Sequence, residues 1–168
     1  MVVNTFGNVS QASCLEVIAN KYGVPPKVLL SIAIAESGAN PHAIGSMNAN
    51  GTIDMGLMQI NSAWLPRLKE FGIKKTDLMK PCVSIEVAAW LISQNINRYG
   101  NTWKAIGAYN SGNIKYQALY IKRVADVYHL LEARRDEESY HKSLLGNRPL
   151  ITSRSIQRID FECDSSDC

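Results

Sequence analysis

Residues 35–61 read AESGANPHAIGSMNANGTIDMGLMQIN, and we predict that the fold is organised around this stretch. It opens with Glu36 at the end of an apolar run and closes with the hexapeptide 56–61 (GLMQIN). Asp54 lies just before that hexapeptide. Two carboxylates and several amide side chains therefore fall within one short segment, and the other segments are expected to hold it in place.

Glu36 lies near the C-terminal end of a helix predicted over residues 27–37. Two prolines precede this helix and suit its first turn, and Gly38 suits its C-terminal cap. Val28, Ile32 and Glu36 are spaced four apart and so share one stripe of the helix. A carboxylate in line with core-facing residues loses hydration and lies at the negative end of the helix dipole. Both effects favour the protonated form, which is the form that a general acid requires.

Asp54 follows Asn50 and Gly51, a dipeptide that favours a two-residue hairpin turn. We therefore place Asp54 on the second strand of a short β ribbon within residues 42–61. A protonated carboxyl in an apolar niche, opposite a second carboxylate in a polar one, is the arrangement used to cleave glycosidic bonds.

Three segments resemble the conserved blocks of the soluble lytic transglycosylase domain, a lysozyme-like family that acts on peptidoglycan. They are residues 36–41 (ESGANP), 56–61 (GLMQIN) and 108–112 (AYNSG), and they occur in the family's order. The resemblance covers residues 14–128. Within the family, the chain most resembles the small specialised enzymes that open the wall for secretion, conjugation and pilus machines. This closer resemblance rests on the small size of the chain and on the presence of Asp54.

The resemblance implies a mainly α fold of the lysozyme-like α+β type, with a small β-hairpin flanking a saccharide-binding groove. We assign residues 11–135 to the catalytic domain and residues 143–168 to a C-terminal tail that is flexible or docks on a partner. The implied reaction is cleavage of the β-1,4 bond between N-acetylmuramic acid and N-acetylglucosamine, with formation of a 1,6-anhydro ring. Peptidoglycan glycan strands are the expected substrate, and no metal or cofactor is expected.

Glu36 and Asp54 are the expected catalytic residues. The expected substrate-binding residues are Ser37, Met58, Gln59, Asn61, Tyr109 and Asn110. Gly56 is expected to let a sugar approach closely, and Met58 to offer an adaptable apolar surface. Two alternatives stay open: Asn61 and Gln59 can cap a helix predicted over residues 62–71, and Tyr109 can be a half-buried packing residue. We expect Trp64 in the core.

Two other functions compete with lytic transglycosylation. The first is a muramidase, in which water replaces the muramoyl O6 and Asp54 acts with Glu36. The second is a catalytically idle module that binds the wall during assembly of a secretion apparatus. A desolvated acid that costs stability argues against an idle groove.

The composition is that of a single ordinary domain. The chain has 168 residues, a net charge of +3 and no apolar run near the ~20 residues that span a bilayer. This charge is far from a nucleic-acid-binding signature, so we expect no nucleic-acid partner, no membrane span and a monomer. Residues 1–10 show no signal peptide, so we expect a mature or trimmed form of a periplasmic protein.

Cys14 and Cys82 lie at the starts of two predicted helices, 11–22 and 81–99. The family resemblance implies a disulfide between them, while in a reducing compartment both would be buried thiols. Cys163 and Cys168 are expected to pair with each other or to stay free. We expect the helix over 81–99 to be the buried central one because it is apolar around most of its circumference. Further helices are predicted over 103–109 and from 114 until the charged run at 132–138.

Overall fold

The computed structural model describes residues 13–145, with side chains described as far as residue 140. It is mainly α with one small antiparallel sheet, as predicted. The elements in chain order are α1 (Cys14–Tyr22), α2 (Pro26–Ser37), β1 (Asp54–Met55), β2 (Ile60–Asn61), the 3-10 helix η1 (Ser62–Trp64), α3 (Leu65–Lys69), the 3-10 helix η2 (Lys75–Met79), α4 (Pro81–Tyr99), α5 (Trp103–Asn110) and α6 (Ile114–Leu145).

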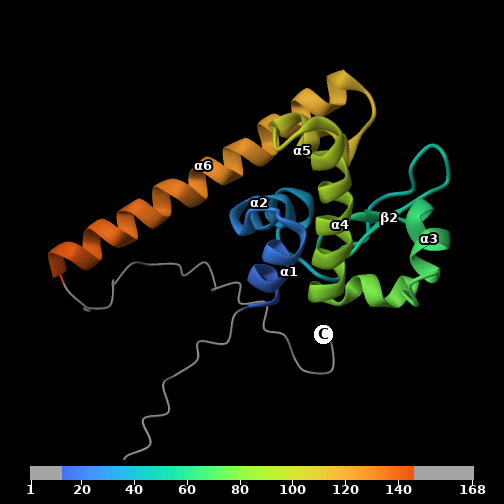
Figure 1. The fold of residues 1–168 in the computed structure, drawn as a ribbon, viewed down its shortest axis with the longest axis horizontal. Coiled ribbons are helices and arrows are strands. Elements are labelled where there is room, and N and C mark those ends of the chain that lie inside the picture. The colour runs from blue at the N-terminus through green and yellow to red at the C-terminus, as the bar shows by residue number, and fades with distance from the viewer. Residues whose placement is uncertain (1–12, 146–168) are drawn as a thin grey trace, which may run out of the picture.

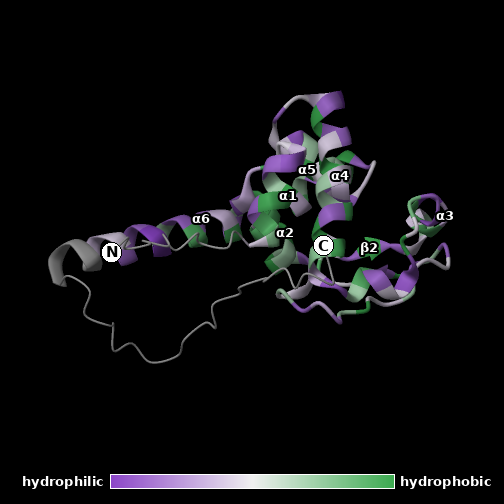
Figure 2. Cartoon of the chain, turned by 60° about the horizontal axis from the view of Figure 1, so that its bottom comes forward, coloured by the Kyte–Doolittle hydropathy of each residue, from purple (hydrophilic) through white to green (hydrophobic). Residues whose placement is uncertain are grey.

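Helix α4 forms the centre of the fold, which confirms the prediction of a buried central helix. It lies between the α1–α2 pair on one side and the β ribbon with α3 on the other, while α6 crosses above α2 and projects beyond it (Figure 1). Ile85, Ala88 and Ile92 on α4 are fully buried, as are Leu29 and Ile32 on α2. Hydrophobic residues gather on α2 and α4, whereas hydrophilic residues prevail along the outer part of α6 (Figure 2).

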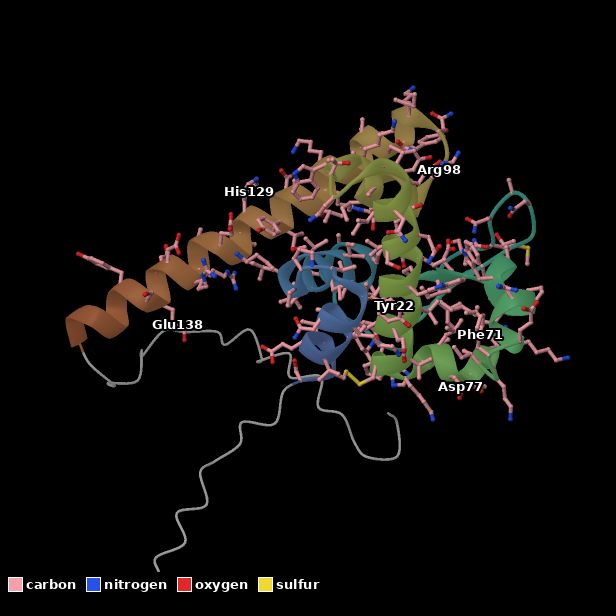
Figure 3. All side chains as sticks on the ribbon, in the orientation of Figure 1. Tyr22, Phe71, Asp77, Arg98, His129 and Glu138 are labelled. Carbon is pink, nitrogen blue, oxygen red and sulfur yellow. A yellow bond between two sulfur atoms is a disulfide. The ribbon has the colours of Figure 1, made fainter. Side chains whose placement is uncertain are left out.

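A disulfide joins Cys14 at the start of α1 to Cys82 in the first turn of α4, as implied by the family resemblance. Their Cα atoms are 5.8 Å apart, and the bond appears in yellow between the two helices (Figure 3). It closes a loop with a sequence separation of 68 residues around the segment that carries Glu36 and Asp54. Cys163 and Cys168 lie outside the described residues.

The β ribbon is confirmed, but Asp54 lies on its first strand, β1, and not on the second strand as predicted. The turn that precedes Asp54 also differs from the prediction. Asp54 pairs with Asn61 and Met55 with Ile60, and a further bridge joins Ile44 to Met55. The amide of Asn48 donates to Thr52 and that of Gly51 to Asn48, so the loop holds three residues, with Gly51 at φ 80°. The prediction of a two-residue turn is wrong because Gly51 takes the left-handed position that closes a three-residue loop.

Two helices differ in length from their predicted ranges. The predicted helix over residues 62–71 is a 3-10 turn, η1, followed by the short α3. Helix α6 runs to Leu145, through the charged segment at 132–138 and past residue 135, where we end the catalytic domain. Gln117, Tyr120 and Val124 are the buried residues in the described part of α6, and Glu132 pairs with Lys27 of α2 at 2.9 Å. Residues 146–168 of the predicted tail lie outside the described residues.

Within the described residues, no helix combines the length and the apolar character needed to cross a bilayer.

Candidate active site

Glu36 lies in the last turn of α2, where Gly38 at φ 63° ends the helix. Its side chain is 11% exposed and lines a pocket of about 450 Å³ that Asp54 lines as well. Burial raises the pKa of Glu36 above its ordinary value, and the negative charge of Asp54 raises it further. Tyr120 and Arg123 oppose this shift without reversing it. The predicted acid therefore faces a second carboxylate and favours its protonated form.

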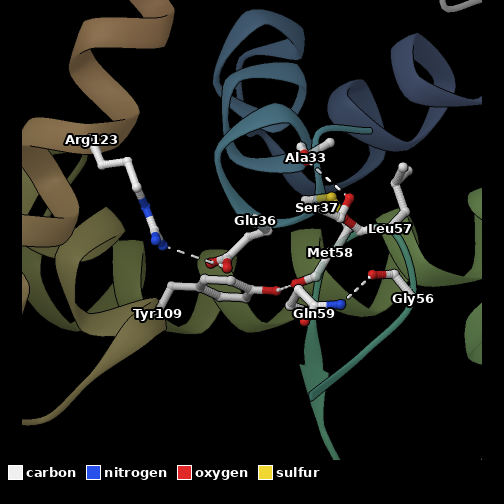
Figure 4. A network of polar contacts seen from close by, with 9 residues as sticks. All are labelled: Ala33, Glu36, Ser37, Gly56, Leu57, Met58, Gln59, Tyr109 and Arg123. Carbon is white, nitrogen blue, oxygen red and sulfur yellow. Dashed lines mark hydrogen bonds and ion pairs between the residues drawn. The ribbon is translucent and has the colours of Figure 1, made fainter. Parts of the chain in front are cut away.

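Helix α6 supplies the two groups that lower the pKa of Glu36, and neither was predicted from the sequence. Nη2 of Arg123 lies 3.6 Å from Oε2 of Glu36 (Figure 4). The Tyr120 hydroxyl is buried beside Glu36 and, among the described residues, has no hydrogen bond of ordinary geometry. The helical spacing of Tyr116, Tyr120 and Val124 predicts a packing face only, and nothing in it indicates that this face meets α2 at Glu36.

Asp54 has polar surroundings. Its Oδ1 accepts a hydrogen bond from the side-chain amide of Asn61 at 2.7 Å, and its Oδ2 accepts one from Asn48 at 3.2 Å. Thr52 lies in the same network, because it accepts from both of those amides. The two carboxylates thus differ, because Glu36 is largely buried beside Tyr120 and Arg123, whereas Asp54 is held by amide donors.

The hexapeptide 56–61 is held by side chains from three helices. Ser37 of α2 donates to the carbonyl of Leu57 at 2.7 Å, and Tyr109 of α5 donates to the carbonyl of Met58 at 2.7 Å (Figure 4). Ser84 of α4 accepts from the amide of Met58 at 3.1 Å. These bonds fix the hexapeptide relative to Glu36, so it forms one wall of the pocket with little freedom to move.

Two expectations for this segment are wrong. Met58 is fully buried, so its side chain offers no surface to a sugar. Gly56 at φ 75° faces protein, because a Cβ there would lie 2.0 Å from the carbonyl oxygen of Leu78. Ser37 donates its hydroxyl to the backbone of the hexapeptide, and its expected contact with substrate stays a prediction. Left-handed residues at Gly56 and Gln59 flank Met58, so its side chain departs from the direction that a regular strand would give.

The other expected substrate-binding residues all line the pocket: Gln59, Asn61, Tyr109 and Asn110. Asn61 caps η1, as one prediction had it, because its Oδ1 accepts from the amide of Ala63. Its Nδ2 also donates to Asp54 in the pocket. Gln59 uses its amide donor on the carbonyls of Ala43 and Gly56. The Tyr109 hydroxyl binds Met58, and burial, with the nearby carboxylates, raises its pKa well above the ordinary value.

Trp64 lines the pocket and is 40% exposed, so the expectation of a core position is wrong. Its ring packs edge-on against Trp90, with centroids 5.9 Å apart. A second pocket of about 590 Å³ shares Trp64, Leu91 and Tyr109 with the first. On the other side, a pocket of about 380 Å³ shares Asn110. The first pocket, which Glu36 lines, therefore shares residues with each of the other two, and the three together are called the groove below.

Metal-binding residues do not cluster in this region. In the part of the chain that the structure describes, no group of three or more His, Cys, Asp or Glu side chains could hold a metal ion.

The profile of the transglycosylase SLT domain matches residues 13–123, which include both carboxylates and the whole hexapeptide. The chain belongs to this family. The match covers most of the described residues and ends at Arg123, so the long outer part of α6 lies beyond it.

Several relatives align over most of their own length. Invasion protein IagB of Salmonella typhimurium is 36% identical over 136 residues, covering 78% of this chain and 84% of IagB. Protein IpgF of Shigella flexneri is 37% identical over 123 residues, covering 72% and 80%. An X polypeptide of Escherichia coli is 30% identical over 158 residues, covering 92% and 89%.

Among solved structures, an inactive mutant of the lytic transglycosylase Slt from Pseudomonas aeruginosa has a similar fold. The TM-score is 0.57 at 20% identity, and the match covers 86% of this chain. The chain spans about a quarter (26%) of the length of that protein. The likeness confirms the lysozyme-like fold predicted from the sequence.

Proposed function

We propose that this protein is a peptidoglycan lytic transglycosylase that cleaves the β-1,4 bond between N-acetylmuramic acid and N-acetylglucosamine. The observation that carries the proposal is Glu36, a buried carboxyl with a raised pKa, facing Asp54 across a long groove. A general acid needs a pKa near the operating pH, and burial at the end of α2 moves Glu36 in that direction. Family membership supplies the class of polymer.

In the proposed reaction, Glu36 first gives its proton to the glycosidic oxygen as the bond from that oxygen to the muramoyl C1 breaks. Positive charge develops at C1, and the carboxylate of Asp54 stabilises it. Glu36, now ionised, then takes the proton of the muramoyl O6 while O6 bonds to C1. The products are a free 4-hydroxyl and a 1,6-anhydro ring, and Glu36 regains its starting state.

A specific observation favours a second candidate, muramidase hydrolysis. Asp54 is held in the groove by two amide donors, which would also orient it as the nucleophile of a retaining hydrolase. In that reaction water replaces O6 in the second step. We place transglycosylation first because a buried Glu36 can serve both proton transfers without Asp54 forming a covalent bond.

We also propose that the protein acts on the wall in the periplasm, opening it locally for a secretion, conjugation or pilus apparatus. Its resemblance to small specialised enzymes supports this role. So does the name of one relative, an invasion protein, which fits an enzyme dedicated to one machine.

The proposal can be tested by the release of soluble muropeptides from purified sacculi. Glu36→Gln should abolish release, and Asp54→Asn should lower it strongly but less, because the substrate's 2-acetamido group can act as internal nucleophile. Glu70→Gln is the matched control, since Glu70 is an exposed carboxylate paired with Arg67 on α3. Turnover by Glu36→Gln at the level of Glu70→Gln would disprove the assignment of the acid.

A further inference from the structure

Arg123 spans the distance between the buried acid and an open part of the groove. Its side chain is 52% exposed, whereas that of Glu36 is 11% exposed, and the two meet through one contact of 3.6 Å. Its guanidinium also lies 5.2 Å from the ring centroid of Tyr120. A guanidinium carries five N–H donors, so most of its hydrogen-bonding capacity faces solvent.

The pocket beside Arg123 has the composition of a ligand site. Asn110, Ser111, Tyr116, Leu119, Tyr120 and Arg123 line its volume of about 380 Å³. It offers one cation, amide and hydroxyl groups, and the exposed side chains of Tyr116 and Leu119. Tyr120 also lines this pocket, and its buried hydroxyl lies beside Glu36, so the pocket borders the catalytic carboxyl.

The groups that face Glu36 come from three elements. Asp54 belongs to β1, Tyr109 to α5, and Tyr120 and Arg123 to α6. Of these, Arg123 is the cation, and it is also the one with a long, half-exposed side chain. Its charge lowers the pKa of Glu36 and so acts against the protonated form that the reaction needs. A ligand that draws Arg123 away would favour the acid.

We propose that Arg123 binds a carboxylate of the peptide attached to the muramoyl sugar, in the pocket with Asn110 and Tyr116, and that this releases Glu36 from its ion pair. The inference rests on the proposed function, because the glycan backbone carries only hydroxyl and amide groups and the peptide branch supplies the negative charge. The pocket adjoins the central one through Asn110, so a branch on a sugar near Glu36 reaches it. Substrates that carry peptide carboxylates are thereby preferred.

The test compares Arg123→Gln with Lys122→Gln, a neighbouring exposed cation that pairs with Asp126 outside the groove. Three substrates are used: soluble peptide-bearing glycan strands, the same strands with their peptide carboxylates converted to amides, and strands from which an amidase has removed the peptides, leaving the lactyl carboxylate. Arg123→Gln should lower kcat/KM on the first substrate about tenfold or more, the effect of one charge-assisted hydrogen bond. On the other two it should equal or exceed the unaltered protein.

An equal loss on all three substrates would overturn the inference, and a loss that persists on the amidase-treated strands would assign the lactyl carboxylate instead. The pH profile tests the release of Glu36. For the unaltered protein, the basic limb of kcat should lie at higher pH on peptide-bearing strands than on amidated strands, and Arg123→Gln should abolish that difference. If the basic limb of the unaltered protein lies at the same pH on both substrates, substrate binding does not release Glu36 from Arg123. If the unaltered protein cleaves none of the substrates, the proposed function itself fails.

Discussion

Gly56→Ala should damage this protein far more than an ordinary glycine substitution. Gly56 has φ 75°, and a Cβ at this position would lie 2.0 Å from the carbonyl oxygen of Leu78 and 3.2 Å from Oγ of Ser84. Gly23 provides the matched control, because it has φ 65° and nothing within 4 Å of its Cβ position. The two substitutions share the backbone strain and differ in the collision.

The expected magnitudes follow from these two contributions. A left-handed alanine costs about 1–2 kcal/mol, which is all that Gly23→Ala should lose. At Gly56 the backbone of η2 or of the hexapeptide must move, which adds roughly 1–3 kcal/mol for overpacking and about 1 kcal/mol for the weakened hydrogen bond to Ser84. Gly56→Ala should therefore lower the free energy of unfolding by roughly 3–6 kcal/mol.

Urea unfolding followed by circular dichroism at low temperature measures both losses on one scale. The activity of the folded fraction gives a second readout, since displacement of the hexapeptide moves the wall that faces Glu36. Gly56→Ala should therefore lose activity even where it is fully folded, and Gly23→Ala should keep it. A difference in unfolding free energy below about 0.5 kcal/mol between the two variants would show that the contact with Leu78 adds no cost at Gly56.

Three further predictions concern the disulfide, the aromatic end of the groove and the ionisation of the acid. Replacing Cys14 and Cys82 together by serine should lower the free energy of unfolding by about 2–4 kcal/mol in urea titrations, because the bridge closes a long loop; an unchanged midpoint would contradict a stabilising bridge. Trp64→Ala should raise KM on glycan strands about two- to tenfold through lost stacking, whereas Phe71→Ala, an exposed aromatic outside the central pocket, should not; equal effects would refute a sugar platform. Because burial raises the pKa of Glu36 above 4.5, the unfolded chain releases this proton at lower pH than the folded one. The folded state therefore loses stability as pH rises above the ordinary pKa of the carboxyl. In thermal scans the melting temperature of Glu36→Gln should match that of the wild type near about pH 4 and exceed it near about pH 7. A difference in melting temperature that is constant with pH would contradict the raised pKa.

Regular helices account for most of what could be predicted from the sequence. The stripe that contains Glu36 follows from a helical period, and Gly38 ends that helix with the expected left-handed conformation. The apolar circumference of residues 81–99 likewise identifies the central helix. In these segments each side-chain direction follows from its position in the repeat, so burial can be inferred residue by residue.

The irregular segments and the distant contacts could not be predicted in this way. Met58 is buried because left-handed residues precede and follow it, and neither turn leaves a periodic pattern in the sequence. Trp64 is exposed because a 3-10 turn, rather than a full helix, carries it to the edge of the groove. Arg123 approaches Glu36 only because α6 crosses α2, a tertiary contact that no local pattern encodes.

We propose that Glu36 cleaves the glycan by ring closure rather than by addition of water. Its most direct test is to digest sacculi in oxygen-18-labelled water and to analyse the released muropeptides by mass spectrometry. We expect 1,6-anhydro ends that carry no label and that disappear with Glu36→Gln. Reducing ends that carry the label would show that the protein is a muramidase and would contradict the proposed reaction.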